Sequence, residues 1–255
     1  MCELFAMSAN HPTDVNQSLD LLRPRGGEIG LHADGWGVAF YEGRAARIFK
    51  EPIPASKSRC LAFITEYDYQ STLAIAHIRK ANPANIGRAS ANTHPFDREL
   101  NGRSWVFAHN GKLPGLRDNP DFAVSRFQPL GETDSERAFC LLLDTIADRH
   151  KTDGAARSAS EIIQTIRPLV EKLAALGEFN FILSDGENLI VHTHTNLYSL
   201  TRTCRVASCQ LEVVLLATSP LTDEPWVPLS PGSMHVYAKG REVTLTARPA
   251  AAQAS

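Results

Sequence analysis

The second residue of the chain, Cys2, occupies a position where a cysteine can act as a nucleophile without a separate base. Initiator methionine is normally removed when the next residue is small, so loss of Met1 would leave Cys2 with a free α-amino group. An α-amino group has a pKa of about 7.7 to 8.0, so a fraction is neutral at physiological pH and can take the thiol proton. One residue would then supply both nucleophile and base. Because a cysteine at position 2 is usually incidental, this hypothesis depends on other residues.

An Asn-Gly pair at positions 110 and 111 could stabilise the intermediate that such a cysteine would form. Attack of the thiolate on a carboxamide produces a tetrahedral oxyanion, which needs hydrogen-bond donors already in place. Asn110 can offer its side-chain amide and Gly111 its backbone N–H, and glycine permits close approach of the backbone. The alternative interpretation of an Asn-Gly pair is a hairpin turn. Taken alone the pair favours the turn, and the motifs around it favour catalysis.

Six short motifs occur in one order along the first half of the chain. They are the Met1–Cys2 start, DGWGVAF at 34–40, AHIR at 76–79, NTHPF at 92–96, HNGKL at 109–113 and ETDSE at 132–136. As an ordered set they resemble the motifs of the class II glutamine amidotransferases, and are closest to the short, stand-alone YafJ-type members. The resemblance implies an N-terminal-nucleophile fold, with Cys2, Asn110 and Gly111 as catalytic residues.

The same resemblance implies how a glutamine or γ-glutamyl substrate would be held. Arg79 would bind its α-carboxylate, a task that suits the two-pronged guanidinium. Asp134 would bind its α-ammonium group, and Thr93 and His94 would belong to the substrate-binding wall. The alternatives are an exposed arginine after a strand and, for Asp134, a helix cap. Capping and substrate binding can coexist at the start of a helix.

The spacing after the arginine departs from that of the sugar-aminating members, in which the Thr-His element follows almost immediately. Here thirteen residues, Lys80 to Asn92, separate Arg79 from Thr93. We expect this loop at the rim of the pocket, where it would select the remote part of the substrate. Related stand-alone proteins are associated with hydrolysis of γ-glutamyl amides or peptides, so the resemblance implies such substrates beside glutamine.

Three histidines of the motifs, His77, His94 and His109, are expected to support the pocket walls by hydrogen bonding. No acidic residue accompanies them at a recognisable metal-ligand spacing, and the terminal amine already provides a base, so we expect neither a metal site nor a Cys-His dyad. His192 and His194 alternate on a predicted strand and would share one face. A structural pair is expected there rather than a metal site.

The elements that must position these residues follow from the hydrophobic patterns. We predict a strand at 2–9, a short helix at 14–25, a hairpin around 35–52, a helix at 56–66, and buried strands at 71–79 and 103–111. The segment from 80 to 96 has loop chemistry. Helices follow at 133–149 and 159–176, then strands in FNFILSDG, NLIVHTH, LYSLTR, EVVLLATSP, MHVYAKG and EVTLTAR, with a frayed tail at 249–255.

This order permits layers of sheet and helix around one core, and the resemblance implies a four-layer α/β/β/α sandwich of the α+β class. We expect one domain over 1–255. The net charge of −2 and the ordinary composition do not indicate a nucleic-acid partner. The first residues, MCELFAMSANHP, have neither a basic leader pattern nor a long apolar stretch, and no run approaches the roughly 18 apolar residues needed to span a membrane. We therefore expect a cytoplasmic protein. Five scattered cysteines without a CxxC pair predict neither disulfides nor structural zinc.

The expected function is that of a glutaminase or γ-glutamyl amidohydrolase. Cys2 would form a γ-glutamyl thioester, water would release glutamate together with ammonia or an amine, and no cofactor would be needed. One alternative is a glutaminase subunit that delivers ammonia to a separate synthase. Another is a non-catalytic module that binds γ-glutamyl ligands, for instance because Met1 is retained.

Overall fold

The computed structural model describes residues 2–80, 86–153, 158–206 and 209–244, which form two antiparallel sheets and four α-helices. The first sheet has the order β11-β9-β10-β1-β4-β2-β3. Its strands are β1 (Glu3–Thr13), β2 (Gly35–Glu42), β3 (Ala45–Glu51), β4 (Ser71–Arg79), β9 (Tyr198–Val206), β10 (Cys209–Ala217) and β11 (Val227–Pro228). The strand that follows Cys2 therefore lies in the middle of this sheet.

The second sheet has the order β13-β12-β8-β7-β6-β5. Its strands are β5 (Phe96–Glu99), β6 (Ser104–Lys112), β7 (Glu178–Ser184), β8 (Leu189–His192), β12 (Met234–Ala238) and β13 (Arg241–Glu242). The Asn-Gly motif lies at the end of β6, so the two proposed catalytic elements come from different sheets.

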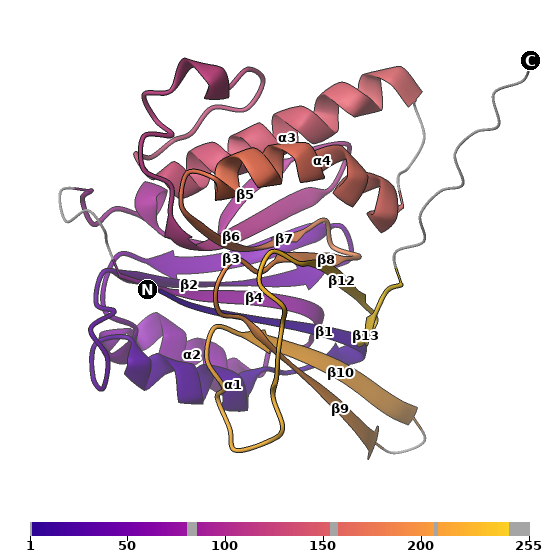
Figure 1. The fold of residues 1–255 in the computed structure, drawn as a ribbon. Helices are drawn as coiled ribbons and strands as arrows, with labels where there is room; N and C mark the ends of the chain where they lie inside the picture. Colours follow the sequence, from indigo (N-terminus) through magenta and orange to yellow (C-terminus); the bar gives the residue numbers. More distant parts are fainter. Residues whose placement is uncertain (1, 81–85, 154–157, 207–208, 245–255) are drawn as a thin grey trace, which may run out of the picture.

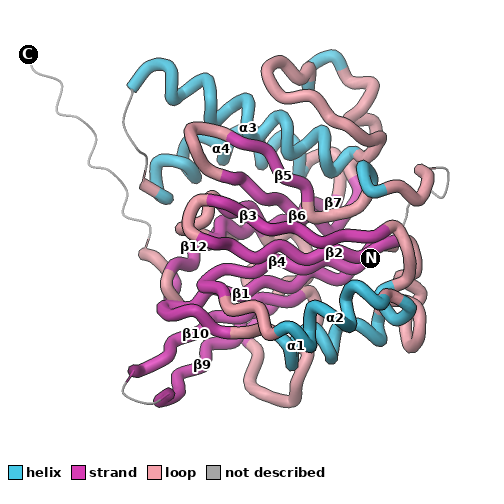
Figure 2. Tube along the Cα trace, turned by 180° about the vertical axis from the view of Figure 1, so that it is seen from behind, coloured by secondary structure: helices cyan, strands magenta, loops and turns pink. Residues whose placement is uncertain are grey.

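Helices cover the outer face of each sheet, as Figures 1 and 2 show from opposite sides. α1 (Asn16–Leu22) and α2 (Arg59–Tyr67) pack on the first sheet. α3 (Asp134–Asp153) and α4 (Ala159–Ala174) pack on the second. The layer order is helix, sheet, sheet, helix, which confirms the predicted four-layer α+β sandwich.

Alternation along the strands explains why two sheets stack in this way. In β1, Phe5 and Met7 pack among α1 and α2, whereas Leu4 and Ala6 point into the layer between the sheets. In β6, Val106 and Ala108 enter the same middle layer, while Phe107 faces α3. Successive side chains point to opposite faces of a strand, so a strand that is apolar on both faces needs a partner layer on each side.

Some predicted boundaries differ from the structure. The segment predicted as loop through Phe96 contains a 3₁₀ turn at Ser90–Asn92, and β5 begins at Phe96. The helix predicted at 56–66 is instead a 3₁₀ turn, Ala55–Lys57, followed by the α-helix α2. Ser58 caps α2, because its side chain accepts a hydrogen bond from the Leu61 N–H. The strand predicted through 248 is described only over Arg241–Glu242, and the predicted frayed tail lies outside the described residues.

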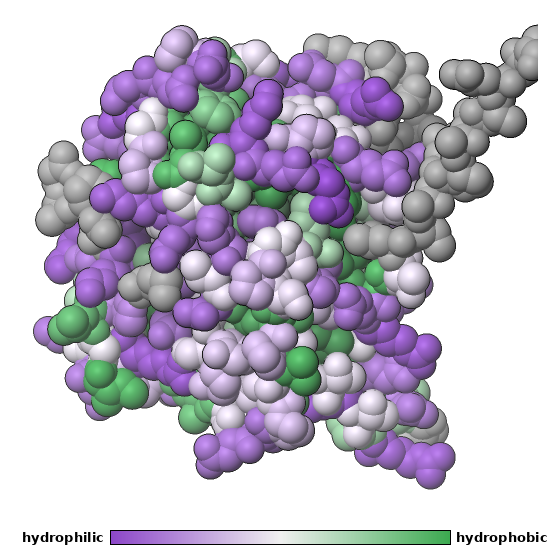
Figure 3. Space-filling view, viewed as in Figure 1, coloured by the Kyte–Doolittle hydropathy of each residue, from purple (hydrophilic) through white to green (hydrophobic). Residues whose placement is uncertain are grey.

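The surface seen in Figure 3 is mainly hydrophilic, with apolar residues in small separate groups. Among the described residues, the most exposed large apolar side chains are Leu31, Leu130 and Ile29, at 79%, 79% and 75% exposure. No helix in the described part of the chain is both long and apolar enough to cross a membrane.

Candidate active site

The pairing of the central strands brings the sequence-predicted residues together. β1 runs antiparallel to β4 with Glu3 opposite Ile78, so Cys2, just before β1, lies beside Arg79 at the end of β4. Asn110 reaches the same place from β6 of the other sheet, and its Oδ1 accepts a hydrogen bond from the backbone nitrogen of Cys2 at 2.9 Å. The site therefore sits where the two sheets meet.

The bond between Cys2 and Asn110 has a direct chemical meaning. The nitrogen that donates it is the atom that becomes the α-amine when Met1 is removed. Asn110 uses Oδ1 for this contact, and none of the described residues accepts a hydrogen bond from its Nδ2. One amide side chain can thus orient the base through its oxygen and offer a donor to an oxyanion through its nitrogen.

The thiol of Cys2 lies against the backbone that follows Arg79. Its Sγ is 3.3 Å from the Lys80 nitrogen, which donates to it, and 3.4 Å from the Lys80 carbonyl oxygen. Burial raises the pKa of the Cys2 thiol, and the Asp134 carboxylate raises it further. The hydrogen bond from the Lys80 backbone and the charge of Arg79 lower this pKa, but by less. A thiol with a raised pKa needs a base to form the thiolate, and the adjacent amine can be that base.

Arg79 is held with its guanidinium enclosed. It is 4% exposed, and one of its terminal nitrogens donates to the Asp34 carbonyl oxygen at 3.2 Å. Burial lowers its pKa, while Asp34 and Cys2 act in the opposite direction. The Asp34 carboxylate pairs with Arg88 of the long loop at 2.9 Å. The alternative of an exposed arginine after a strand is wrong.

Asp134 begins α3, but the hydroxyl of Thr133 caps the helix by accepting from the Glu136 N–H at 3.1 Å. The Asp134 carboxylate accepts instead from the Leu113 N–H at 2.7 Å and the Ser135 N–H at 2.8 Å. It therefore fastens the start of α3 to the segment just after the Asn-Gly motif. Its charge also acts to raise the pKa of the Cys2 thiol.

Gly111 lies within β6, so the hairpin-turn interpretation of Asn-Gly is wrong. It pairs with Phe179 of β7, and a Cβ at this position would come 1.9 Å from the Glu178 carbonyl oxygen. Only glycine fits such a close approach. Gly37 of the DGWGVAF motif is required for a similar reason, because a Cβ at this position would lie 2.3 Å from the His94 carbonyl oxygen.

Thr93 and His94, which lie between the long loop and β5, are both buried. The Thr93 hydroxyl donates to the Ala89 carbonyl oxygen at 2.8 Å. The His94 ring packs 4.1 Å from the His77 ring and 4.5 Å from the Phe96 ring, measured between centroids. Neither ring nitrogen of His94 has a protein partner among the described residues. The sequence predicted both as substrate-binding residues, and the structure shows that both are buried.

The other histidines are buried supports. His109 contacts the Ser135 hydroxyl at 2.8 Å and the Glu178 carbonyl oxygen at 3.1 Å. Burial lowers the pKa of His109 and of His94, and lowers that of His77 to about 3. The strand predicted to hold His192 and His194 ends at His192, so the two do not share a strand face. No group of metal-ligating side chains occurs within the described ranges.

Several residues of this region carry no sequence signal. Lys50 of β3 donates to the Thr93 and Pro95 carbonyl oxygens at 3.1 and 3.3 Å. Glu3 accepts from Thr218 and Ser219 at 2.9 and 3.0 Å, which anchors the start of β1. These contacts depend on which strands become neighbours, so only the register of the sheets could have revealed them.

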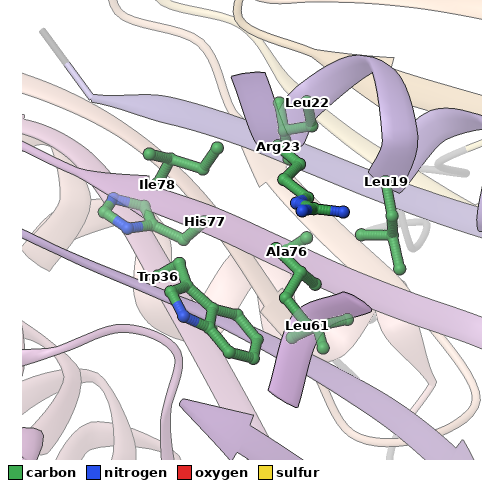
Figure 4. A pocket seen from close by; sticks show the side chains of 10 residues that line it. Leu19, Leu22, Arg23, Trp36, Leu61, Ala76, His77 and Ile78 are labelled. Carbon is green, nitrogen blue, oxygen red and sulfur yellow. The ribbon is translucent and has the colours of Figure 1, made fainter. Parts of the chain in front are cut away.

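A small apolar cavity lies beside β4, on the side of the first sheet that α1 and α2 cover (Figure 4). It is lined by Leu19, Leu22, Arg23, Trp36, Gly37, Val38, Leu61, Ala76, His77 and Ile78. Cys2 is not among its lining residues, so this cavity is not the predicted site.

Comparison with known proteins decides the family. The family model of glutamine amidotransferases class-II matches residues 1–255. The chain belongs to the class II glutamine amidotransferases. It is 39% identical over 262 residues to "Putative glutamine amidotransferase YafJ" of Escherichia coli, a match that covers 95% of this chain and all of that protein. Its N-terminal-nucleophile fold is therefore that of its family.

Two further relatives extend the comparison. The crystal structure of a predicted glutamine amidotransferase from Pseudomonas aeruginosa has a TM-score of 0.67 and 31% identity, and the match covers 95% of this amidotransferase and 100% of that chain. The gamma-glutamyl-hercynylcysteine sulfoxide hydrolase of Mycobacterium tuberculosis is 27% identical over 231 residues, which cover 88% of this chain and 83% of that protein. One relative of this chain is thus named for hydrolysis of a γ-glutamyl compound.

Proposed function

We propose that this class II amidotransferase hydrolyses the side-chain amide of glutamine or of a γ-glutamyl compound. The observation that carries the proposal is the 2.9 Å hydrogen bond between the Cys2 nitrogen and Asn110 Oδ1. It joins the nucleophilic residue to the oxyanion element of the other sheet. The γ-glutamyl hydrolase among the relatives supports hydrolysis as the reaction class.

The first half of the reaction acylates the enzyme. The neutral α-amine of Cys2 takes the thiol proton, and Sγ attacks the carbonyl carbon of the substrate amide. The oxyanion accepts from Asn110 Nδ2 and the Gly111 N–H. The C–N bond then breaks, the ammonium form of the α-amine returns its proton to the departing nitrogen, and ammonia or an amine leaves a γ-glutamyl thioester on Cys2.

The second half repeats these roles with water. The α-amine takes a proton from water, the oxygen attacks the thioester carbonyl, and the same two donors hold the second oxyanion. Breaking of the C–S bond releases glutamate and restores the thiol with the proton from the amine. Arg79 would hold the α-carboxylate and Asp134 the α-ammonium group throughout, with the Thr93–His94 wall behind them.

The test is glutamate release from glutamine and a panel of γ-glutamyl amides and peptides, with Met1 removal verified by intact mass. Processed wild type should release glutamate, and Cys2→Ala should not. Absence of release from verified processed protein would contradict free-standing hydrolysis. In a parallel arm, an added synthase and its acceptor would distinguish delivery of ammonia, since acceptor amination would then exceed that with free ammonium at the same concentration.

A further inference from the structure

Two consecutive carbonyl groups of β6 each accept a hydrogen bond from a buried side chain. The His109 carbonyl oxygen lies 3.2 Å from Nε2 of His77, which comes from β4 of the other sheet. The Asn110 carbonyl oxygen accepts from Nδ2 of Asn180 at 3.0 Å, and Asn180 is its cross-strand neighbour on β7. Both donor side chains are fully buried, at 0% exposure.

These two carbonyls belong to the peptide groups that carry the oxyanion element. The Asn110 carbonyl and the Gly111 N–H share one planar peptide group, so a bond that fixes the oxygen also fixes the direction of the N–H. A donor to the carbonyl also polarises the amide and strengthens the bond that its N–H can make. The His109 carbonyl lies in the preceding peptide group, and its orientation sets where the Asn110 side chain starts.

The geometry points to Asn180 and His77 as positioning residues that hold these two peptide groups so that Asn110 and Gly111 face the oxyanion. This inference rests on the proposed function. The two side chains come from different sheets, so they hold β6 from two directions.

Every hydrogen-bonding position of the Asn180 amide is occupied. Nδ2 donates to the Asn110 carbonyl and, at 2.9 Å, to the Thr195 hydroxyl, while Oδ1 accepts from the His194 and Thr195 N–H groups at 2.8 and 2.9 Å. The oxygen therefore holds the loop after β8, and the nitrogen reaches the oxyanion strand. This division allows the two roles to be separated by substitution.

For His77, the partner decides the tautomer. A carbonyl oxygen only accepts, so Nε2 must carry the proton that it donates. Burial lowers the pKa of His77 to about 3, so the ring is neutral at physiological pH with its proton on Nε2. Glutamine can present an N–H donor in a similar place, whereas leucine cannot.

The main test compares Asn180→Asp with Thr195→Val. Asn180→Asp keeps the oxygen that holds the loop and removes the N–H donor to the Asn110 carbonyl. We expect kcat to fall about 10- to 100-fold with KM nearly unchanged, because the oxyanion exists only in the transition state and intermediate. Thr195→Val removes the other bond of Nδ2 and should change kcat by less than about threefold. Cys2 alkylation by a γ-glutamyl diazoketone should slow in parallel with kcat.

A second pair of variants covers the case in which Asn180→Asp does not fold. His77→Leu should lower kcat about tenfold or more, and His77→Gln should recover most of this loss. Melting temperatures of all variants separate loss of fold from loss of positioning.

The outcomes distinguish this inference from the proposed function. Cys2-dependent hydrolysis that persists at the wild-type kcat in Asn180→Asp and His77→Leu would overturn the inference alone. The inference would also be overturned if kcat fell equally in Asn180→Asp and Thr195→Val and in proportion to the fall in their melting temperatures. A processed wild type that neither hydrolyses the substrates nor is alkylated at Cys2 would overturn the proposed function and the inference with it.

Discussion

Two clusters of this molecule carry the residue types of a hydrolase, and they differ in how their hydrogen-bonding groups are used. The first is the Cys2 site at the junction of the two sheets. The second lies at the β12–β13 edge of the second sheet, where Ser233 Oγ is 2.7 Å from Nε2 of His235, and Nδ1 of His235 is 2.7 Å from a carboxylate oxygen of Glu242. The second cluster thus has the serine–histidine–acid order of a hydrolytic triad.

The groups around Ser233 are already occupied by the protein. Its Oγ also lies 2.5 Å from the Ser230 carbonyl oxygen, and its N–H donates to that same carbonyl at 3.1 Å. The neighbouring Gly232 N–H donates to the Thr193 carbonyl oxygen at 2.6 Å. At the Cys2 site, by contrast, Asn110 Nδ2 has no acceptor among the described residues. Nucleophile–base geometry alone does not make a site, because acyl transfer also needs donors that are free for the oxyanion.

The largest effect should come from blocking the Cys2 amine. A chain carrying a protease-cleavable extension before Cys2 has an amide nitrogen there instead of an amine, so the base is lost. We expect glutamate release to be about 10² to 10⁴-fold slower before cleavage than after it, the usual contribution of a general base. The cleaved sample, verified by intact mass, is the matched control. Equal rates before and after cleavage would show that another group serves as the base.

Asn110→Asp should have the next largest effect. Aspartate keeps an oxygen to accept from the Cys2 nitrogen but loses the N–H donor for the oxyanion, so kcat should fall about 10² to 10³-fold. Steady-state kinetics on the best substrate measure this. Asn110→Ala, which also loses the contact with Cys2, should be at least as slow, and an Asn110→Asp enzyme with wild-type kcat would remove Asn110 from the oxyanion site.

Arg79→Lys should act on binding rather than on turnover. Lysine cannot make the two parallel hydrogen bonds that arginine makes to the α-carboxylate. A hydrogen bond to a charged group is worth about 1.5 to 3 kcal/mol, so KM should rise about 10- to 100-fold. The measurement compares a substrate with its α-carboxylate free and the same substrate with that group converted to an amide. Only the free acid should be sensitive to the substitution; equal sensitivity of both would place the α-carboxylate elsewhere.

The pH dependence of stability should report the buried histidines beside the first cluster. Burial lowers the pKa of His77 to about 3 and also lowers those of His94 and His109. The unfolded chain therefore binds more protons below about pH 6.5, and stability that is complete above this pH is lost as the pH falls, by up to about 1.4 kcal/mol per pH unit and group. Urea unfolding between pH 7 and pH 4.5 measures the slope, which should be shallower in His77→Gln. An unchanged slope would mean that His77 titrates alike in both states.

The sequence predicted those parts of the molecule that local patterns determine. Short apolar runs located β4 and β6, and helical patterns located α3 and α4. The ordered motifs indicated the family, and with it the four layers. β5 was missed because Phe96–Glu99 is short and gains its pairing only from β6. Short edge strands depend on a neighbour that local sequence does not specify.

The site was predicted by residue type but not by contact. The pairing of Cys2 with Asn110, and of Asn110 with Asn180, depends on how the two sheets stack and on the register of β6 with β7. Asp134 illustrates the same limit, since its bond to the Leu113 N–H joins two segments that are distant in the sequence. The helix cap was local: the sequence allowed Thr133 or Asp134, and the Thr133 hydroxyl takes that role. Contacts between segments distant in the sequence have no local pattern from which to be inferred.

The smallest effect is expected at the second cluster, where Ser233→Ala should leave glutamate release within about twofold of wild type. The hydroxyl links the Ser230 carbonyl to the His235 ring, so its removal should cost about 0.5 to 1.5 kcal/mol of stability, the value of one ordinary hydrogen bond. Kinetics and urea unfolding measure the two quantities, and a fluorophosphonate probe should not label Ser233 in the wild type. Labelling that is lost in Ser233→Ala would show that Ser233 reacts even though the neighbouring N–H groups already donate to backbone carbonyls. Free oxyanion donors would then not be what distinguishes the two clusters.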